Sequence, residues 1–245
     1  MSRLGKLVSR SVAARRLGFA FYGTSRTPTP RRVKLRGRWV SLSFPDEPGY
    51  VLDIMNLWLD DEYGLHSLPT SPQTVVDVGA NVGFFSLWSA HLHPHARIFA
   101  YEPNPRILPH LKSNTTAFST IEVFACGLGA TAGKARMEDQ GESRLAATRQ
   151  SDRGEIIIET MSQAIARCGG LVDLLKLDCE GAEWDLFQDP KSFRAVRLIR
   201  MEYHLVNGHT LDEFKQTVAA LGFSIERLVE NQGFGVAWLR NDSAI

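Results

Sequence analysis

The chain has 245 residues, of which 44% are hydrophobic and 22% are charged, with a net charge of +1. This length suits one domain with a well-buried core and is short for two. No run approaches the roughly 18 uninterrupted apolar residues of a membrane span, so we expect a soluble, cytoplasmic protein. The three cysteines (Cys126, Cys168 and Cys179) have no paired or metal-ligand spacing, which fits free thiols and argues against a zinc site.

The basic residues are concentrated at the N-terminus. Residues 1–45 hold 11 of the 28 Lys and Arg residues and no acid, whereas residues 46–245 hold all 27 acidic residues. We expect residues 1–31 to form a basic arm with a helix over 4–20, either solvated or docked on the acidic body. Contact with an anionic membrane, organelle targeting and contact with nucleic acid remain open alternatives. Because the arm has few apolar residues to bury, we expect it to be dispensable for the fold.

Residues 32–245 are expected to form the main domain, with residues 32–70 as its N-terminal hairpin and helix. Residues 32–43 alternate apolar and polar side chains around Arg36-Gly37, which predicts the hairpin. Residues 50–66 read as a helix, with Val51, Ile54, Leu57 and Trp58 on one face.

From residue 74 onward, strand-like and helix-like segments alternate, which indicates an α/β fold with a mostly parallel sheet and helices on both faces. The last two strands flank Asn231-Gln-Gly and predict an antiparallel hairpin at the sheet edge. The predicted strands are 74–78, 97–101, 121–125, 172–178, 196–203, 223–228 and 234–239, and the predicted helices are 83–92, 105–113, 159–167, 183–188 and 211–220.

The strongest motif is the turn within residues 75–84, where an apolar strand runs into Gly79, Asn81 and Gly83 and a helix follows at once. Glycine lets the backbone approach a ligand closely, and asparagine tolerates a positive φ. Glu102 ends the next strand, where its carboxylate is placed to accept hydrogen bonds from both hydroxyls of a ribose. The pattern therefore predicts a nucleotide-cofactor site.

The residue before the turn narrows the choice of cofactor. Dinucleotide sites favour G-x-G-x-x-G, which brings backbone N–H groups to a pyrophosphate. Here the spacing is G-x-N-x-G, and the Asp77 carboxylate would repel pyrophosphate but could pair with the ammonium group of a methionine moiety. A nicotinamide or flavin site and a turn needed only for packing are the alternatives.

Three segments, Asp77–Gly83, Tyr101–Asn104 and Leu175–Glu183, resemble the FkbM-type methyltransferase family, and the likeness covers roughly residues 48–240. The resemblance implies the Rossmann-like, seven-stranded class I methyltransferase fold and the cofactor S-adenosylmethionine. It also implies O-methylation of a hydroxyl on a small-molecule or glycan acceptor. The expected cofactor-binding residues are Asp77, Gly79, Ala80, Asn81, Gly83, Phe84, Glu102, Pro103, Asn104, Cys126, Gly127 and Asp178.

The chain departs from the family after the third strand. The family often carries a polar or acidic residue near the adenine there, whereas this chain reads Ala125-Cys-Gly-Leu-Gly-Ala. The adenine amino group would then need a backbone carbonyl or a more distant side chain, which weakens the assignment of Cys126 and of its neighbour Leu128.

Polar residues at the end of the strand over 172–178 point to the reaction. A central parallel strand is normally apolar on both faces, so Lys176 and Asp178 are unusual there. One interpretation is a buried ion pair that shapes the sheet. The other places Asp178 and Glu180 at the methyl-transfer pocket, with Lys176 keeping a neighbouring carboxylate ionised.

The next strand ends with Glu202 and His204, which we expect to contact the substrate together with Glu180. Methyl transfer from a sulfonium needs no acid for the leaving group, so the enzyme positions the acceptor and removes its proton. Asp178, Glu180 and His204 are the candidate bases, with Lys176 in support. The same residues would suit a divalent cation, but their spacing fixes no ligand geometry and we assign no metal site.

Several alternatives remain. Glu62 and Tyr63 are candidates either to close over the cofactor or to pack. A nucleic-acid or protein N-methyltransferase is the first rival function, but the acidic turn Asp178-Cys-Glu-Gly is unsuited to phosphate, so we do not expect nucleic acid as a partner. A non-catalytic S-adenosylmethionine-binding protein is the second rival. We expect the segments near 130–158 and 203–212 to shape the pocket, but they contain no motif that identifies the acceptor. The sequence does not indicate an oligomeric state.

Overall fold

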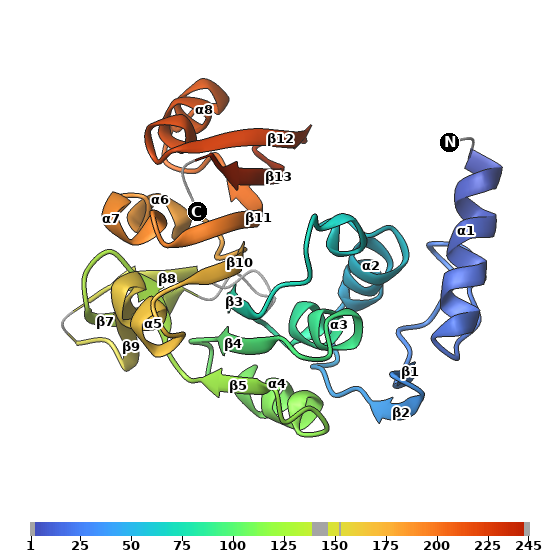
Figure 1. The fold of residues 1–245 in the computed structure, drawn as a ribbon. Coiled ribbons are helices and arrows are strands. Elements are labelled where there is room, and N and C mark those ends of the chain that lie inside the picture. Colours follow the sequence, from blue (N-terminus) through green and yellow to red (C-terminus); the bar gives the residue numbers. More distant parts are fainter. Residues whose placement is uncertain (1–2, 139–146, 152, 243–245) are drawn as a thin grey trace.

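The computed structural model describes residues 3–138, 147–151 and 153–242 (Figure 1). Its centre is a seven-stranded sheet in the order β12–β13–β11–β10–β3–β4–β5. The five strands from β11 to β5 are parallel, and β13 and β12 continue the sheet antiparallel at one edge. The predicted α/β fold and the edge hairpin are therefore confirmed. The strands are β3 (Thr74–Val78), β4 (Arg97–Tyr101), β5 (Ile121–Phe124), β10 (Val172–Leu177), β11 (Val196–His204), β12 (Phe223–Glu230) and β13 (Phe234–Asn241).

Alternate residues of the central strands enter two separate cores, one on each face of the sheet. Val75 of β3 packs in the core that contains α3 (Phe84–Leu92), whereas its neighbour Val76 packs in the core on the other face. That second core receives residues from α5 (Met161–Arg167), α6 (Glu183–Leu186), α7 (Pro190–Phe193) and α8 (Leu211–Ala220). A smaller cluster forms beneath α4 (Leu108–Thr115). Burial on both faces explains why β3 and β10 are nearly continuous apolar runs.

A second sheet occupies a region that the sequence led us to treat as loop. Its order is β6–β9–β7–β8, and β6 continues from the end of β5. The segment carries glycines and charged residues without a clear alternation, so its periodicity gave no strand signal. The part of the expected pocket loops at 139–146 and 152 lies outside the described residues. The strands are β6 (Gly127–Gly129), β7 (Gly133–Glu138), β8 (Ala147–Gln150) and β9 (Ile156–Thr160).

The predicted N-terminal hairpin is present as β1 (Arg32–Leu35) and β2 (Arg38–Ser41). The long helix expected over 50–66 is instead broken. It consists of α2 (Tyr50–Ile54), a π-helical turn η1 (Met55–Leu59) and a short 3-10 turn η2 (Leu65–Ser67). Asp61 and Gly64 have positive φ angles of 52° and 64°, which a continuous α-helix does not allow. The break leaves Glu62 and Tyr63 on an irregular segment.

The N-terminal helix α1 (Arg3–Arg16) is docked on the body rather than free. Arg10 donates to both carboxylate oxygens of Asp60, and Lys6 lies 2.9 Å from the same carboxylate. Ala14 and Leu17 are buried in the same core as η1. Our expectation that the arm has little to bury is therefore wrong for this part of it, and its dispensability for the fold stays a prediction. None of the helices in the described ranges has the length and apolar character that crossing a bilayer requires.

Candidate functional site

A cavity of about 750 Å³ opens at the carboxyl ends of β3, β4, β10 and β11. This is where open α/β sheets bind their ligands, and the volume lies within the range of about 300–1,000 Å³ typical of small-molecule sites. The cavity is lined at one end by the turn after β3 and by Glu102, and at the other by the ends of β10 and β11. It therefore has room for a nucleotide cofactor and an acceptor side by side.

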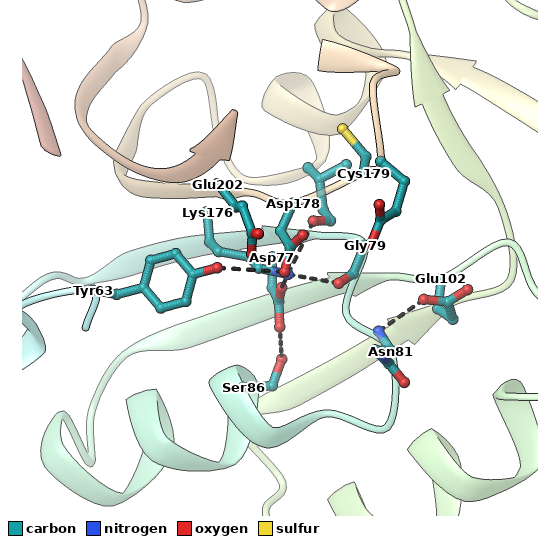
Figure 2. A network of polar contacts seen from close by, with 12 residues as sticks. Tyr63, Asp77, Gly79, Asn81, Ser86, Glu102, Lys176, Asp178, Cys179 and Glu202 are labelled. Carbon is teal, nitrogen blue, oxygen red and sulfur yellow. Dashed lines mark hydrogen bonds and ion pairs between the residues drawn. The ribbon is translucent and has the colours of Figure 1, made fainter. Parts of the chain in front are cut away.

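The turn after β3 requires its glycine for a tertiary reason. A Cβ on Gly79 would stand 1.9 Å from the backbone oxygen of Asp178, and the φ of Gly79 is +71°. Asn81 also has a positive φ of 50°, and its side-chain oxygen accepts from the N–H of Val82. The bare backbone at Gly79 thus lets the ends of β3 and β10 meet at the floor of the cavity (Figure 2).

Glu102 is buried at the cavity wall, and both of its carboxylate oxygens accept backbone hydrogen bonds. Oε2 lies 2.7 Å from the N–H nitrogen of Asn81 and Oε1 lies 2.8 Å from that of Asn104. Burial raises the pKa of Glu102 to about 7, although the two N–H groups oppose this rise. Each oxygen keeps a second lone pair that can accept a hydroxyl of a ligand. The backbone bonds therefore orient the carboxylate and leave it able to bind a ribose.

A buried chain of charges lies beneath the cavity (Figure 2). The Lys176 ammonium nitrogen is 3.3 Å from Asp77 and 3.4 Å from Asp178, and it donates to the carbonyl oxygen of Gly79 at 2.6 Å. Burial by itself lowers the pKa of Lys176, but the charges of Asp178 and Asp77 outweigh it and raise this pKa above its usual value. Asp77 is completely buried, and its other carboxylate oxygen accepts a hydrogen bond from the hydroxyl of Ser86. Lys176 therefore stays charged and ties the cofactor turn to Asp178.

The opposite end of the cavity gathers Asp178, Glu180, Glu202 and His204. The imidazole Nε2 of His204 lies 3.4 Å from Glu180 and 3.9 Å from Glu202. The hydroxyl of Tyr63 donates to Asp178 at 3.4 Å, so the segment after η1 closes over this end. Glu180 holds a left-handed backbone with φ of 54°. Such strain in a non-glycine residue costs about 1–3 kcal/mol and persists mainly at functional sites.

Glu183 is a residue that the sequence analysis missed as part of the site. It is completely buried in the first turn of α6 and accepts the backbone N–H of His204 at 2.7 Å. The same oxygen lies 3.1 Å from Nδ1 of the His204 ring, and the other oxygen accepts the N–H of Gly181. Glu183 thus holds the ring with Nε2 toward the acids. Its place at the end of the segment Leu175–Glu183 was the signal that could have identified it.

The environment of His204 changes the role expected for it. Burial by itself lowers its pKa, but the hydrogen bond and charge of Glu183, followed by Glu180 and Asp178, raise this pKa to about 9. An imidazolium has no free lone pair, so in this state His204 cannot accept a proton at neutral pH. For Glu202, burial and then the nearby charge of Asp178 raise the pKa to about 8. Among the candidate bases, the geometry favours a carboxylate over the histidine.

These raised pKa values predict an unusual dependence of stability on pH. Glu102, Glu202 and His204 have folded-state pKa values of about 7, 8 and 9, each above its ordinary value. At a pH between a group's ordinary pKa and its raised pKa in the folded protein, the folded protein binds more protons than the unfolded chain. The free energy of unfolding therefore falls as pH rises through this interval. We expect the free energy of unfolding of the cofactor-free protein to fall by several kcal/mol between about pH 6 and pH 9, and the Tm to fall with it.

Calorimetry in a buffer series measures this loss directly. The variant carrying Glu202→Gln and His204→Gln removes two of the three titrations and should show a flatter profile. A Tm that is constant or rises over this interval in the wild-type protein would contradict the charge states assigned above.

The carboxylates and the histidine also form a group with the donors of a metal site. One oxygen each from Asp178 and Glu180 and one ring nitrogen of His204 all lie within 4.8 Å of one another. A carboxylate on the second ring nitrogen, as Glu183 provides here, is usual for histidines that ligate metals. The arrangement is therefore chemically able to hold a divalent cation, which would replace the proton of His204.

The structure brings most of the predicted site residues to one cavity but not all of them. Gly79, Asn81, Glu102, Pro103, Gly127 and Leu128 line it, together with Asp178, Glu180, Glu202 and His204. Asp77 and Lys176 lie beneath, Asn104 holds Glu102, and Phe84 packs in the core. Ala80, Gly83 and Cys126 do not line the cavity either. Cys126 packs in the core that contains α5 to α8, and burial raises the pKa of its thiol to about 12. The lining residues that the sequence did not indicate are Leu52, Asp53, Asn56, Leu57, Asn231, Phe234 and Val236.

Comparisons with known proteins show which proteins this chain resembles in sequence and in fold. The sequence model of the FkbM methyltransferase domain matches residues 77–234. Methyltransferase sdnD of Sordaria araneosa is 27% identical over 220 residues, which cover 74% of this chain and 80% of that protein. Methyltransferase 1 of Beauveria bassiana is 23% identical over 217 residues, covering 77% and 82%. Among solved structures, the fibrillarin pre-rRNA processing protein of Methanococcus jannaschii superposes with a TM-score of 0.53 at 14% identity, covering 86% of this chain and 93% of that one.

Proposed function

Because the chain belongs to the FkbM methyltransferase family and has the Rossmann-like class I methyltransferase fold, we propose that it transfers the methyl group of S-adenosylmethionine to a hydroxyl of a small-molecule or glycan acceptor. One observation carries the proposal: the glycine turn with the Glu102 carboxylate and the acidic group around Asp178 open into the same cavity. A nucleotide-type cofactor held at the first end would present its reactive group to an acceptor held at the second.

The residues at the first end fit the cofactor. Gly79 leaves room that a Cβ would fill, and Glu102 offers two oriented oxygens to a pair of hydroxyls. When bound, S-adenosylmethionine supplies an electrophilic methyl group on a sulfonium. Asp77 is not available for direct contact with the methionine ammonium, because it is completely buried beneath the cavity. It acts as a positioning residue through Lys176, which holds both the Gly79 carbonyl and the Asp178 carboxylate.

At the second end, Asp178 is the proposed base. Its carboxylate is partly exposed in the cavity, and both Tyr63 and Lys176 contact it. Burial and then the charge of Asp178 raise the pKa of Tyr63 well above its usual value, so Tyr63 remains a hydrogen-bond donor. The acceptor hydroxyl would donate to Asp178, which would take the proton as the acceptor oxygen gains the methyl group. The broken carbon–sulfur bond would leave its electron pair on the cofactor sulfur, which becomes a neutral thioether. The His204 cation holds Glu180 and Glu202 beside the acceptor.

A metal-assisted version of this reaction is the second candidate, and the group formed by Asp178, Glu180 and His204 favours it. A divalent cation there would lower the pKa of the acceptor hydroxyl, and Asp178 would then act as a ligand instead of the base. Transfer to nucleic acid is disfavoured, because carboxylates surround the reaction end and would repel phosphates.

Radiolabelled S-adenosylmethionine and a cell lysate divided into small molecules, glycans, protein and RNA test the proposal. We expect label in the small-molecule or glycan fraction, and undiminished transfer after treatment with EDTA. Loss of transfer with EDTA and recovery with Mg²⁺ or Mn²⁺ would instead establish the metal-assisted version. Label confined to RNA or protein would overturn the acceptor class, and cofactor binding without any transfer would favour a non-catalytic role.

A further inference from the structure

The exposed apolar side chains of the protein are concentrated near its N-terminus. Among the described residues, six of the eleven large hydrophobic side chains that are exposed precede residue 40, although this part is a small fraction of the chain. Exposed apolar residues are normal when they are scattered, but a concentration of them marks an interaction surface. The six are Leu4, Leu7, Val8, Val12, Tyr22 and Trp39.

Helix α1 carries two apolar faces. One packs on the body through Ala14, with Leu17 buried just after the helix, and the Arg10–Asp60 ion pair stabilises this contact. The other consists of Leu4, Leu7, Val8 and Val12, whose spacing of three or four residues places them in one stripe. Figure 1 shows α1 at one end of the molecule, with the rest of the protein on one side of it. The stripe is therefore held rigidly on the outside of the fold.

Two further exposed apolar side chains, Tyr22 and Trp39, follow α1 in the chain. Trp39 of β2 packs against Gly18, just after α1, because a Cβ on Gly18 would stand 2.4 Å from the indole ring. The Trp39 side chain is nevertheless 53% exposed and Tyr22 is 67% exposed, and the Arg32 guanidinium lies over the Trp39 ring. Trp and Tyr in such positions are typical of side chains that sit at a membrane–water interface. The same N-terminal part of the chain also carries exposed basic residues: Arg15, Arg16, Arg26, Arg31, Lys34, Arg36 and Arg38.

We propose that this N-terminal surface docks the protein on a membrane rich in anionic phospholipid, with α1 lying in the headgroup region. An apolar stripe, interfacial aromatic residues and a cationic surround are the features of helices that lie in the membrane plane. Nucleic acid would engage the cations but gives the aliphatic stripe no partner. A cleavable targeting segment would not contribute Ala14 and Leu17 to the core. The acidic majority of the body would face away from the anionic lipid.

Sedimentation of the full chain with vesicles tests this docking. We expect binding to phosphatidylcholine vesicles that contain about one third phosphatidylserine, and little binding to phosphatidylcholine alone. Binding should fade as salt is raised from about 0.1 M to 1 M, because the Debye length falls from roughly 10 Å to 3 Å.

Two sets of substitutions separate the apolar and charged contributions. Replacing Leu4, Val8 and Val12 by serine should lower the partition coefficient by more than about tenfold, because these side chains leave water on binding. Replacing Arg15, Arg26 and Arg38 by glutamine should lower it on the order of a hundredfold, since each charge contributes about fivefold. A matched control replaces Ile157, Leu171 and Val229, which are also exposed but lie on the body, by serine and should bind like the wild type.

Equal Tm values for all variants would show that the fold is retained. Equal binding to neutral and anionic vesicles would overturn the proposal. So would unchanged binding by both the Leu4/Val8/Val12 variant and the Arg15/Arg26/Arg38 variant. So would a wild-type dimer that the serine variant converts to monomer with no vesicle binding in either protein, because the stripe would then cover a second copy of the chain. None of these outcomes depends on the methyl acceptor, so the docking surface and the proposed activity are tested separately.

Discussion

Replacing Asp178 by asparagine is expected to lower turnover by about 10²–10⁴-fold, the usual contribution of a general base. Asparagine keeps the shape of the side chain and its contact with Tyr63, but it neither takes the proton of the acceptor nor pairs with the Lys176 charge. Cofactor affinity should change much less than turnover, because Glu102 and the glycine turn remain in place. Steady-state kinetics together with calorimetric titration of the cofactor measure both quantities.

Comparison with His204 distinguishes a base from a positioning residue. His204→Ala should reduce turnover less than Asp178→Asn. The double variant should lose little more than Asp178→Asn alone, because His204 only positions the acceptor for the proton transfer that Asp178→Asn already abolishes. A pH–rate profile whose rising limb survives in His204→Ala would support a carboxylate base. Asp212→Asn, an exposed acid on α8, serves as the neutral control. Near-wild-type turnover of Asp178→Asn with the true acceptor would show that the acidic group stabilises the sheet and takes no part in the reaction.

Replacing Glu102 by alanine is expected to weaken S-adenosylmethionine binding on the order of a hundredfold or more. The change removes two hydrogen bonds from the ribose hydroxyls to a carboxylate, each contributing about 1.5–3 kcal/mol. Affinity in the wild-type protein should also decline as pH falls below about 7, because the pKa of Glu102 is about 7 and protonation removes the charge that strengthens these bonds. Equilibrium titration across a pH series measures both effects.

Two controls accompany this prediction. Glu122→Ala removes an exposed acid on the neighbouring strand β5 and should leave cofactor affinity unchanged. Glu102→Gln keeps one acceptor oxygen and should bind with intermediate affinity, which guards against a loss caused by the freed N–H groups of Asn81 and Asn104. Unchanged affinity in a folded Glu102→Ala protein would refute the ribose assignment.

The residues that the sequence identified best are those whose role follows from their immediate neighbours. The glycine turn after β3 could be predicted because its positive φ angles belong to Gly79, Asn81 and Gly83 themselves. Glu102, Asp178 and His204 could be placed because parallel strands end at the same edge of a sheet. The helix expected over 50–66 failed where Asp61 and Gly64 leave the α-helical region, which periodicity does not detect.

The sequence by itself determined the seven strands of the main sheet along the chain, the turn after β3 and the acids that face the cavity, because strand periodicity and turn geometry are encoded locally. Only the tertiary structure decided how the charges pair and which of them carry protons. Lys176 on β10 contacts Asp77 on the neighbouring strand β3, and His204 at the end of β11 contacts Glu183 in α6. It also decided that α1 is anchored through Asp60 while its outer stripe stays exposed. Burial and charge pairing depend on segments far apart in the chain, so the pKa of His204 and the two faces of α1 became defined only when those segments packed together.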